Sequence, residues 1–299
     1  MKTTDIHQEW GTELHVTPRD FFDQPYNYWR DLLYERKLLV FKKMKFSIEE
    51  YVTWSLRFGI PWDKQDYKYT TEVTQDVYIT TLDGVRKTIP VSPFSNKYSP
   101  RLGMSAMDWH ADIPNKLNKP FPIRSLWMQQ NPNNKSGITS FLNIEDGLDL
   151  LSPHLSHMLP DVEVTQQSWY SAGSELHNYD AIKQHPITGR RSLRVNYFNI
   201  ASKGRHDAWI KSTKIHGVVD GDCGFIEEVI DDLLQHKELL YKHIWDDDDL
   251  IVFDNWSFVH NRSALVFGED KERLLIRITI DHLDSDEWIK HKQEFFNEH

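Results

Sequence analysis

The stretch Leu250-Ile-Val-Phe-Asp-Asn-Trp-Ser-Phe-Val-His260 joins a short apolar run to a polar turn and ends in a histidine. Such a run followed by Asp-Asn is typical of a buried strand that ends in a loop. A second stretch, Trp109-His110-Ala111-Asp112, carries another histidine two positions before an aspartate. Residues i and i+2 of an extended strand point to the same face, so the His110 and Asp112 side chains can converge on one point.

Two histidines and one carboxylate are the composition of the facial triad that binds iron(II). That arrangement occupies one face of the metal and leaves the other positions open for substrate and oxygen. A His-x-Asp pair alone is a weak signal, because most such pairs are ordinary strand or loop residues. Arg273 and Arg277 follow His260 in the sequence. An arginine near a metal suits bidentate capture of a carboxylate, although either arginine alone also fits a solvated strand.

Composition excludes several classes of protein. The chain has 299 residues, a formal net charge of −10 and a single cysteine, Cys223. One cysteine excludes an intrachain disulfide framework and any multi-cysteine zinc site. No stretch approaches the roughly 20 consecutive apolar residues of a membrane helix, and the polar N-terminus lacks a secretory core. We therefore expect a cytoplasmic protein without a membrane partner, and its acidic balance argues against a nucleic-acid partner.

The pattern along the chain favours one continuous domain, since no Pro-rich, Gly-rich or low-complexity linker interrupts it. Apolar spacing and cap residues predict helices near 25–36, 47–58, 145–160 and 225–244. Short apolar or β-branched runs predict strands near 38–41, 77–81, 123–128, 193–199, 250–254 and 274–280. Many short strands with a few helices favour a β sandwich or barrel wrapped by helices.

In combination, these motifs resemble the taurine dioxygenase (TauD/TfdA) family of iron(II)- and 2-oxoglutarate-dependent dioxygenases. His110-x-Asp112 is similar to the family's His-x-Asp motif, and His260 follows Asp254-Asn255 as the family's distal histidine follows an Asp-Asn run. The run His185-Pro-Ile-Thr-Gly-Arg190 is similar to a further family signature. Several motifs occur in the family's order, so the resemblance covers nearly the whole chain.

The resemblance implies a mainly β fold with flanking helices, built on a double-stranded β-helix (jelly-roll, cupin-like) core. It implies a single dioxygenase domain over residues 1–299. The segment of about 80–108 is expected to form a lid, and helical insertions are expected at about 143–160 and 205–245. Such an insert explains the wide spacing between Asp112 and His260.

The resemblance also implies a reaction and the residues that support it. His110, Asp112 and His260 would hold iron(II). Arg273 and Thr139, the latter in Gly137-Ile-Thr-Ser-Phe141, would bind the far carboxylate of the cosubstrate 2-oxoglutarate. With O2, 2-oxoglutarate is decarboxylated to succinate and CO2, and an iron(IV)-oxo species abstracts a substrate hydrogen. The usual outcome is hydroxylation, with desaturation as a further outcome.

The expected substrate is a small molecule: an acid, an amino-acid derivative or a secondary metabolite. By analogy with the taurine enzyme, Arg277 would bind an anionic group, with assistance to 2-oxoglutarate binding as the alternative. The aromatic residues Trp109, Phe141 and Phe258 flank the motifs and could shape an apolar pocket, with core packing as the alternative for each. Family members are often dimers or tetramers, so the resemblance leaves homo-oligomerisation open.

Two alternatives use the same residues differently. A metal-dependent hydrolase would bind zinc through these ligands and would need a general base near the metal-bound water, but no keto acid. Arg273 and Thr139 argue against it, because a hydrolase has no use for a carboxylate clamp. A non-catalytic jelly-roll binding protein would have no need of the ligand set and clamp, both of which this sequence retains.

Overall fold

The structure is a computed structural model. It describes residues 1–62, 75–80, 86–95, 106–112, 122–132, 135–168, 176–193, 210–216, 224–266 and 272–281. The segment of about 80–108 that is expected to form a lid lies partly outside these residues, and Cys223 lies wholly outside them.

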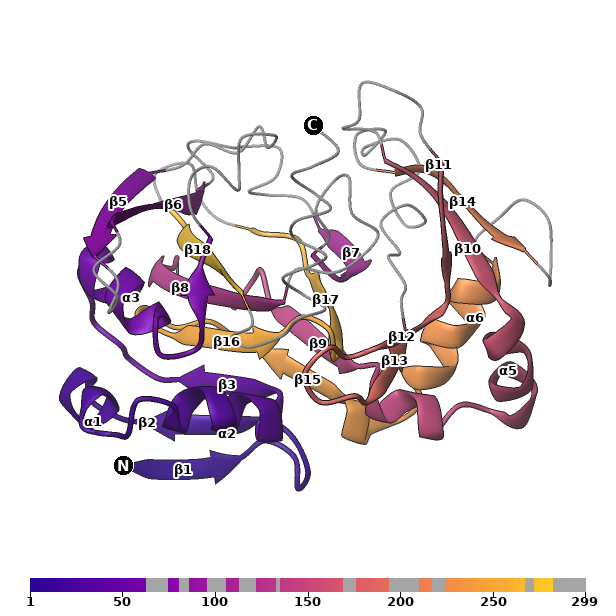
Figure 1. The fold of residues 1–299 in the computed structure, drawn as a ribbon, viewed down its shortest axis with the longest axis horizontal. Helices are drawn as coiled ribbons and strands as arrows, with labels where there is room; N and C mark the ends of the chain where they lie inside the picture. The colour runs from indigo at the N-terminus through magenta and orange to yellow at the C-terminus, as the bar shows by residue number, and fades with distance from the viewer. Residues whose placement is uncertain are drawn as a thin grey trace.

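Two mostly antiparallel sheets form the centre of the molecule (Figure 1). The larger sheet has, in spatial order, β1 (Lys2–Asp5), β2 (Thr12–His15), β3 (Leu38–Phe41), β16 (Leu250–Asp254), β8 (Ile123–Gln130), β18 (Leu274–Asp281), β6 (Arg86–Ser95) and β5 (Gln75–Thr80), and β4 (Ile60–Pro61) pairs with β18. The smaller sheet has β15 (Leu240–His243), β9 (Thr139–Asn143), β17 (Phe258–Arg262) and β7 (Met107–His110).

Strand β18 contributes apolar side chains to both faces of the larger sheet. Side chains alternate between the faces of a strand, and Ile276, Ile278 and Ile280 enter the apolar cluster under the N-terminal helices. Leu275, the residue before Ile276, enters the cluster shared by the two sheets. Full burial of each isoleucine contributes about 1.5–3 kcal/mol to the free energy of unfolding. Arg277 continues the alternation of Leu275 and is therefore directed between the sheets.

Three N-terminal helices cover the outer face of the larger sheet: α1 (Pro18–Phe22), α2 (Tyr28–Arg36) and α3 (Ile48–Ser55). The helix predicted near 47–58 is confirmed as α3. Its cap is Ser47, which accepts from the backbone N–H of Glu50 while the Glu50 carboxylate accepts from that of Ser47. This reciprocal pair satisfies two backbone donors that a helix start leaves open. The predicted helix and strand over 25–41 are also confirmed, with the helix beginning at Tyr28.

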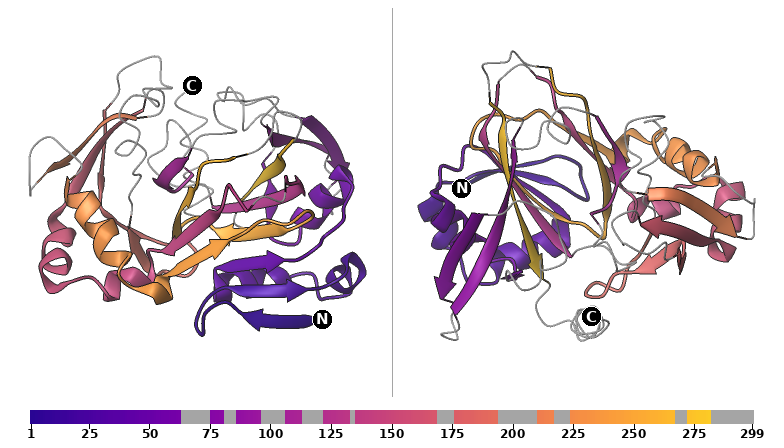
Figure 2. Two further views of the ribbon diagram at one scale, coloured as in Figure 1. Left: turned by 180° about the vertical axis from the view of Figure 1, so that it is seen from behind. Right: turned by 90° about the horizontal axis from the view of Figure 1, so that it is seen from above.

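A lobe between β9 and β15 lies to one side of the sheets (Figure 2). It has its own apolar cluster, to which α6 contributes Ile226, Val229 and Ile230. Its elements are η2 (Asp146–Asp149), α5 (Pro153–Met158), η3 (Leu159–Asp161), β10 (Glu163–Ser168), β11 (Leu176–Asp180), β12 (Ile182–Gln184), β13 (Arg191–Leu193), β14 (Ile210–His216), α6 (Gly224–Leu233) and η4 (Lys237–Leu239).

Three helical predictions in this lobe are wrong in part. The helix predicted over 225–244 ends at Leu233, and 240–243 form β15, which pairs with β9 in the register Leu240↔Leu142. A short apolar run fits both periodicities, and the strand partner decides between them. The insertion predicted as helical at about 205–245 also contains β14, which joins a three-stranded sheet. The helix predicted over 145–160 is divided, with Pro153 in the first turn of α5.

The predicted fold class is confirmed: strands dominate and helices flank them. Within the described ranges, no helix is long and apolar enough to cross a membrane.

Candidate metal centre

The three sequence-predicted ligands lie together between the sheets. His110 ends β7 and stands directly opposite His260 of the neighbouring strand β17, with their ring centroids 4.2 Å apart. Asp112 follows β7 by two residues. One ligand atom from each of the three side chains lies within 4.8 Å of the others. Strand pairing therefore brings together a histidine and a His-x-Asp pair separated by about half the chain.

A hydrogen bond sets the tautomer of His110. Its Nδ1 lies 2.6 Å from the carbonyl oxygen of Asp108. A carbonyl only accepts, so Nδ1 carries the proton and Nε2 keeps its lone pair. Nε2 lies 3.8 Å from Oδ1 of Asp112, so the lone pair and the carboxylate oxygen face one region. An N–H donated to a backbone carbonyl is the usual outer contact of a metal-binding histidine.

Burial and neighbouring charges set the protonation states of the three candidate ligands. Burial lowers the pKa of His110 and, more strongly, of His260, where the neighbouring His110 adds to the effect. Burial alone would raise the pKa of Asp112, but the Arg124 and Arg277 guanidinium groups hold it well below its usual range. At neutral pH the cluster thus presents two neutral imidazoles and one carboxylate, a donor set that fits iron(II).

The two oxygens of Asp112 face different partners. Oδ1 is the oxygen near His110, whereas Oδ2 lies 2.7 Å from Nε of Arg124 and 3.7 Å from Nη1 of Arg277. One oxygen can therefore serve a metal while the other is held by the two arginines. Sequence reasoning missed Arg124. The available signal is a charged residue in the otherwise apolar start of β8, where it is 2% exposed.

Asn255 fixes the backbone of Asp112. Its Oδ1 accepts from the Asp112 N–H at 3.1 Å, and its Nδ2 donates to the Asp112 carbonyl at 2.8 Å. Asp112 lies beyond the end of β7, so strand pairing does not hold this peptide. The sequence motif Asp254-Asn255 thus acquires a role that its spacing alone did not reveal.

The two residues predicted to bind 2-oxoglutarate, Thr139 and Arg273, each have Arg262 as a neighbour. Thr139 of β9 stands opposite Arg262 of β17, and its hydroxyl accepts from Nε1 of Trp245 at 2.9 Å. Gly137, which has a φ of +65°, lies next to Arg273. A Cβ added at Gly137 would be 3.6 Å from Nε of Arg273. Burial and the charge of Arg262 lower the pKa of Arg273 to about 9. Two buried guanidinium groups beside a threonine make this end of the site suited to an anion.

The predicted aromatic residues differ in their relation to the cluster. The Phe141 ring is stacked on that of His260 with centroids 6.0 Å apart, and Phe253, which the sequence did not suggest, lies at 5.2 Å from the same ring. Phe258 is fully buried, with its ring 5.3 Å from that of Trp10. Trp109 is half-buried and packs against the apolar cluster of the lobe.

Residues 2–279 match the family model described as "Taurine catabolism dioxygenase TauD, TfdA family". The chain belongs to the TauD/TfdA family. Enzymes of this family are 2-oxoglutarate-dependent dioxygenases that use iron(II), and they act on small molecules. This chain is therefore such an enzyme. The two-sheet core is accordingly the jelly-roll expected from the sequence.

Several solved structures share the fold of this chain. A taurine dioxygenase from Burkholderia xenovorans has a TM-score of 0.64 and 21% identity, covering 93% of this chain and 90% of its own. A putative alpha-ketoglutarate-dependent taurine dioxygenase from the same organism has a TM-score of 0.66 and 19% identity, covering 93% and 92%. AAD-2 in complex with Mn(II) and N-oxalylglycine has a TM-score of 0.64 and 16% identity, covering 95% and 98%. A comparison with curated proteins found no match.

We expect the metal-free protein to lose stability as the pH falls from 7.5 to 5.5. Burial lowers the pKa of His110, His260 and His243 in the folded state. The unfolded chain therefore binds more protons below its histidine pKa of about 6.5, which costs up to about 1.4 kcal/mol per pH unit for each histidine. Urea unfolding at the two pH values, with chelator present, measures this loss. An unchanged free energy of unfolding would contradict it.

Proposed function

We propose that His110, Asp112 and His260 hold iron(II), and that Arg273 with Thr139 binds the far carboxylate of 2-oxoglutarate. The enzyme would then hydroxylate, or desaturate, a small acidic, amino-acid-derived or secondary-metabolite substrate. The observation that carries the proposal is the convergence of the three ligand atoms within 4.8 Å. The lone pair of His110 Nε2, fixed by the Asp108 carbonyl, supports it.

Each residue group has a separate task in this proposal. The bound metal and its keto acid supply the oxidising chemistry. Asp112 would neutralise part of the metal charge, while Arg124 holds Oδ2 and so restrains the carboxylate. Arg273 provides a planar pair of donors for a carboxylate. Phe141 and Phe253 lie against the His260 ring and exclude water from one side of the centre.

The charges beside Asp112 support an anionic substrate. Arg124 and Arg277 contribute two positive charges near one carboxylate, which leaves an excess of positive charge before the metal is counted. Arg277 is the more distant of the two from Oδ2, and its side chain is 12% exposed, compared with 2% for Arg124. Arg277 is therefore the better placed to reach a carboxylate or sulfonate of a substrate.

Replacing Arg277 by leucine should weaken binding of the substrate anion. A hydrogen bond to a charged group contributes about 1.5–3 kcal/mol, so we expect the dissociation constant of an activating acid to rise about 10- to 100-fold. The measurement is a titration with a panel of carboxylates, amino acids and sulfonates. Arg277→Lys, which keeps the charge, should bind the same acid more tightly than Arg277→Leu. Equal affinities for wild type and Arg277→Leu would remove Arg277 from the substrate site.

The proposed reaction is tested by succinate formation from 2-oxoglutarate. We expect the purified chain to release succinate only with iron(II) and O2, and faster with an acid from the panel. Zinc should not replace iron(II), which separates the proposal from a hydrolase using the same ligands. Succinate release that is independent of iron(II) would contradict the proposal.

A further inference from the structure

We propose that His185, acting through Asp254 and Asn255, is a positioning residue for the metal centre. The inference rests on the proposed metal role of His110, Asp112 and His260 and adds a residue outside that set. The Asn255 side chain makes two hydrogen bonds to the backbone of Asp112. Whatever fixes the turn that carries Asn255 therefore also fixes Asp112, which follows a different strand.

The Asp254 carboxylate organises that turn. Its Oδ1 accepts from the backbone N–H of Trp256 at 2.9 Å, and its Oδ2 lies 3.3 Å from Oγ of Ser257. The same Oδ2 lies 2.6 Å from Nε2 of His185, and neither side chain is exposed. A fully buried carboxylate is costly unless it is hydrogen-bonded, so these donors stabilise this conformation of the turn.

The surroundings of His185 orient its Nε2–H toward the Asp254 carboxylate. Its Nδ1 accepts from the backbone N–H groups of Ile187 and Thr188, both at 3.0 Å. A nitrogen that accepts two N–H groups carries no proton, so the proton of the ring lies on Nε2, facing the carboxylate. The loop 185–190 thus fixes the tautomer as well as the place of the imidazole.

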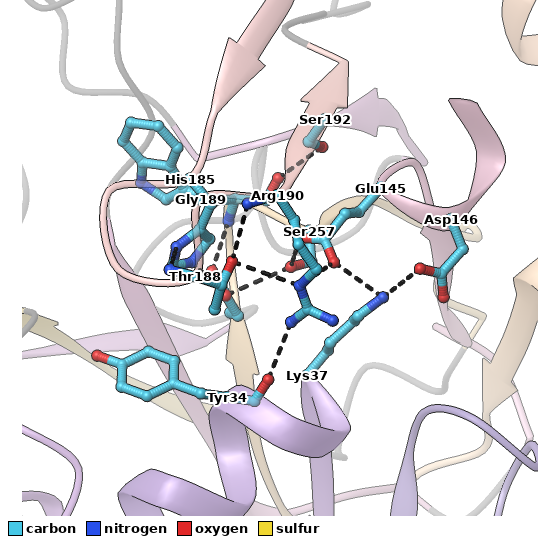
Figure 3. Close-up of polar contacts among 12 residues, drawn as sticks. Tyr34, Lys37, Glu145, Asp146, His185, Thr188, Gly189, Arg190, Ser192 and Ser257 are labelled. Atoms are coloured by element: carbon cyan, nitrogen blue, oxygen red, sulfur yellow. Dashed lines mark hydrogen bonds and ion pairs between the residues drawn. The ribbon is translucent and has the colours of Figure 1, made fainter. Parts of the chain in front are cut away.

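An ion cluster holds this loop against the rest of the molecule (Figure 3). The buried Glu145 carboxylate lies 2.9 Å from both Lys37 Nζ and Arg190 Nε, and it accepts from the Ser257 hydroxyl at 3.0 Å. Arg190 also donates to the Tyr34 carbonyl at 3.0 Å. Three segments distant in sequence therefore meet at the turn that carries Asn255, which makes the turn resistant to displacement.

A second buried histidine–carboxylate pair offers a matched control. Nε2 of His243 lies 3.2 Å from Oδ2 of Asp249, and both side chains are nearly inaccessible to solvent. The Tyr241 hydroxyl contacts the other ring nitrogen at 2.9 Å, while Lys42 and the Asp246 backbone N–H hold the carboxylate. These partners are separate from the turn that clasps the metal ligand. Loss of His243 should therefore reduce stability in a similar way without moving the metal ligands.

The test is an anaerobic titration of the full chain with cobalt(II), followed by visible absorption, together with thermal unfolding of each variant. We expect His185→Leu to raise the cobalt(II) dissociation constant about 3- to 10-fold, which is less than the cost of losing a direct contact of a metal ligand. His185→Gln keeps an N–H donor near the Nε2 position and should recover most of that affinity. His243→Leu should lower the unfolding temperature with little change in the dissociation constant.

Equal cobalt(II) affinity for wild type and His185→Leu, or an equal loss in His243→Leu, would overturn the inference. If His185→Leu does not fold, Ser257→Ala answers the question, because it removes the hydroxyl that joins Asp254 to Glu145. That variant should weaken cobalt(II) about threefold or more, roughly the effect of one net hydrogen bond, and unchanged affinity would count against the inference. A wild-type chain that binds no cobalt(II) would instead overturn the proposed metal role itself.

Discussion

The His110→Ala variant is expected to lose measurable succinate formation and to bind iron(II) at least about 100-fold more weakly than wild type. Loss of an outer contact already costs about 10- to 100-fold in metal affinity, so loss of a ligand should cost more. Asp112 and His260 would remain, but two ligands do not close a face of the metal. Metal binding is measured by anaerobic titration, and turnover by succinate release.

His154→Ala is the control for this substitution. His154 lies exposed on α5, away from the ligand cluster. The control should keep wild-type affinity and turnover. Retention of both by His110→Ala would show that His110 is not a ligand.

The second large effect is expected from Arg273→Met, which should raise the dissociation constant of 2-oxoglutarate about 100-fold or more. Two charge-assisted hydrogen bonds at about 1.5 kcal/mol or more each give this magnitude. Arg273 is 2% exposed and lies beside Gly137. Iron(II) affinity in the absence of 2-oxoglutarate should change little, because Arg273 is not among the clustered ligand side chains.

Arg273→Lys tests geometry separately from charge. Lysine keeps the positive charge but lacks the planar fork, so we expect an intermediate affinity for 2-oxoglutarate. Arg19→Met, at a side chain 89% exposed on α1, controls for the loss of one charge from the chain. Wild-type 2-oxoglutarate affinity in Arg273→Met would assign the cosubstrate carboxylate to another residue, with Arg262 the nearest candidate.

The convergence of His110, Asp112 and His260 could be predicted from sequence because its signals are local. His110 and Asp112 are two residues apart, and His260 follows a recognisable apolar strand and turn. The contact between Arg124 and Asp112 could not be predicted in this way, because it joins β8 to the residues after β7 across the space between the sheets. The hydrogen bonds between Asn255 and the Asp112 backbone likewise could not be predicted, because they join the turn after β16 to the residues after β7.

The errors in the lobe have a similar cause. Leu240 and Ile244 continue the helical spacing of α6, but pairing with Leu142 of β9 satisfies the backbone at Leu240 as a strand. Propensity and periodicity are weak where a partner strand is available. Elements with strong local signals, such as the helix predicted near 47–58, were predicted correctly.

The most direct measurement is an anaerobic absorption titration of the iron(II)-loaded chain with 2-oxoglutarate. Chelation of iron(II) by the keto acid at His110, Asp112 and His260 should produce a weak visible charge-transfer band that saturates at one equivalent per chain. The band should be absent in His110→Ala and should require a higher 2-oxoglutarate concentration in Arg273→Met. Wild-type chain that binds iron(II) yet shows no band, or an unchanged band in His110→Ala, would contradict the assignment of this cluster as the iron site.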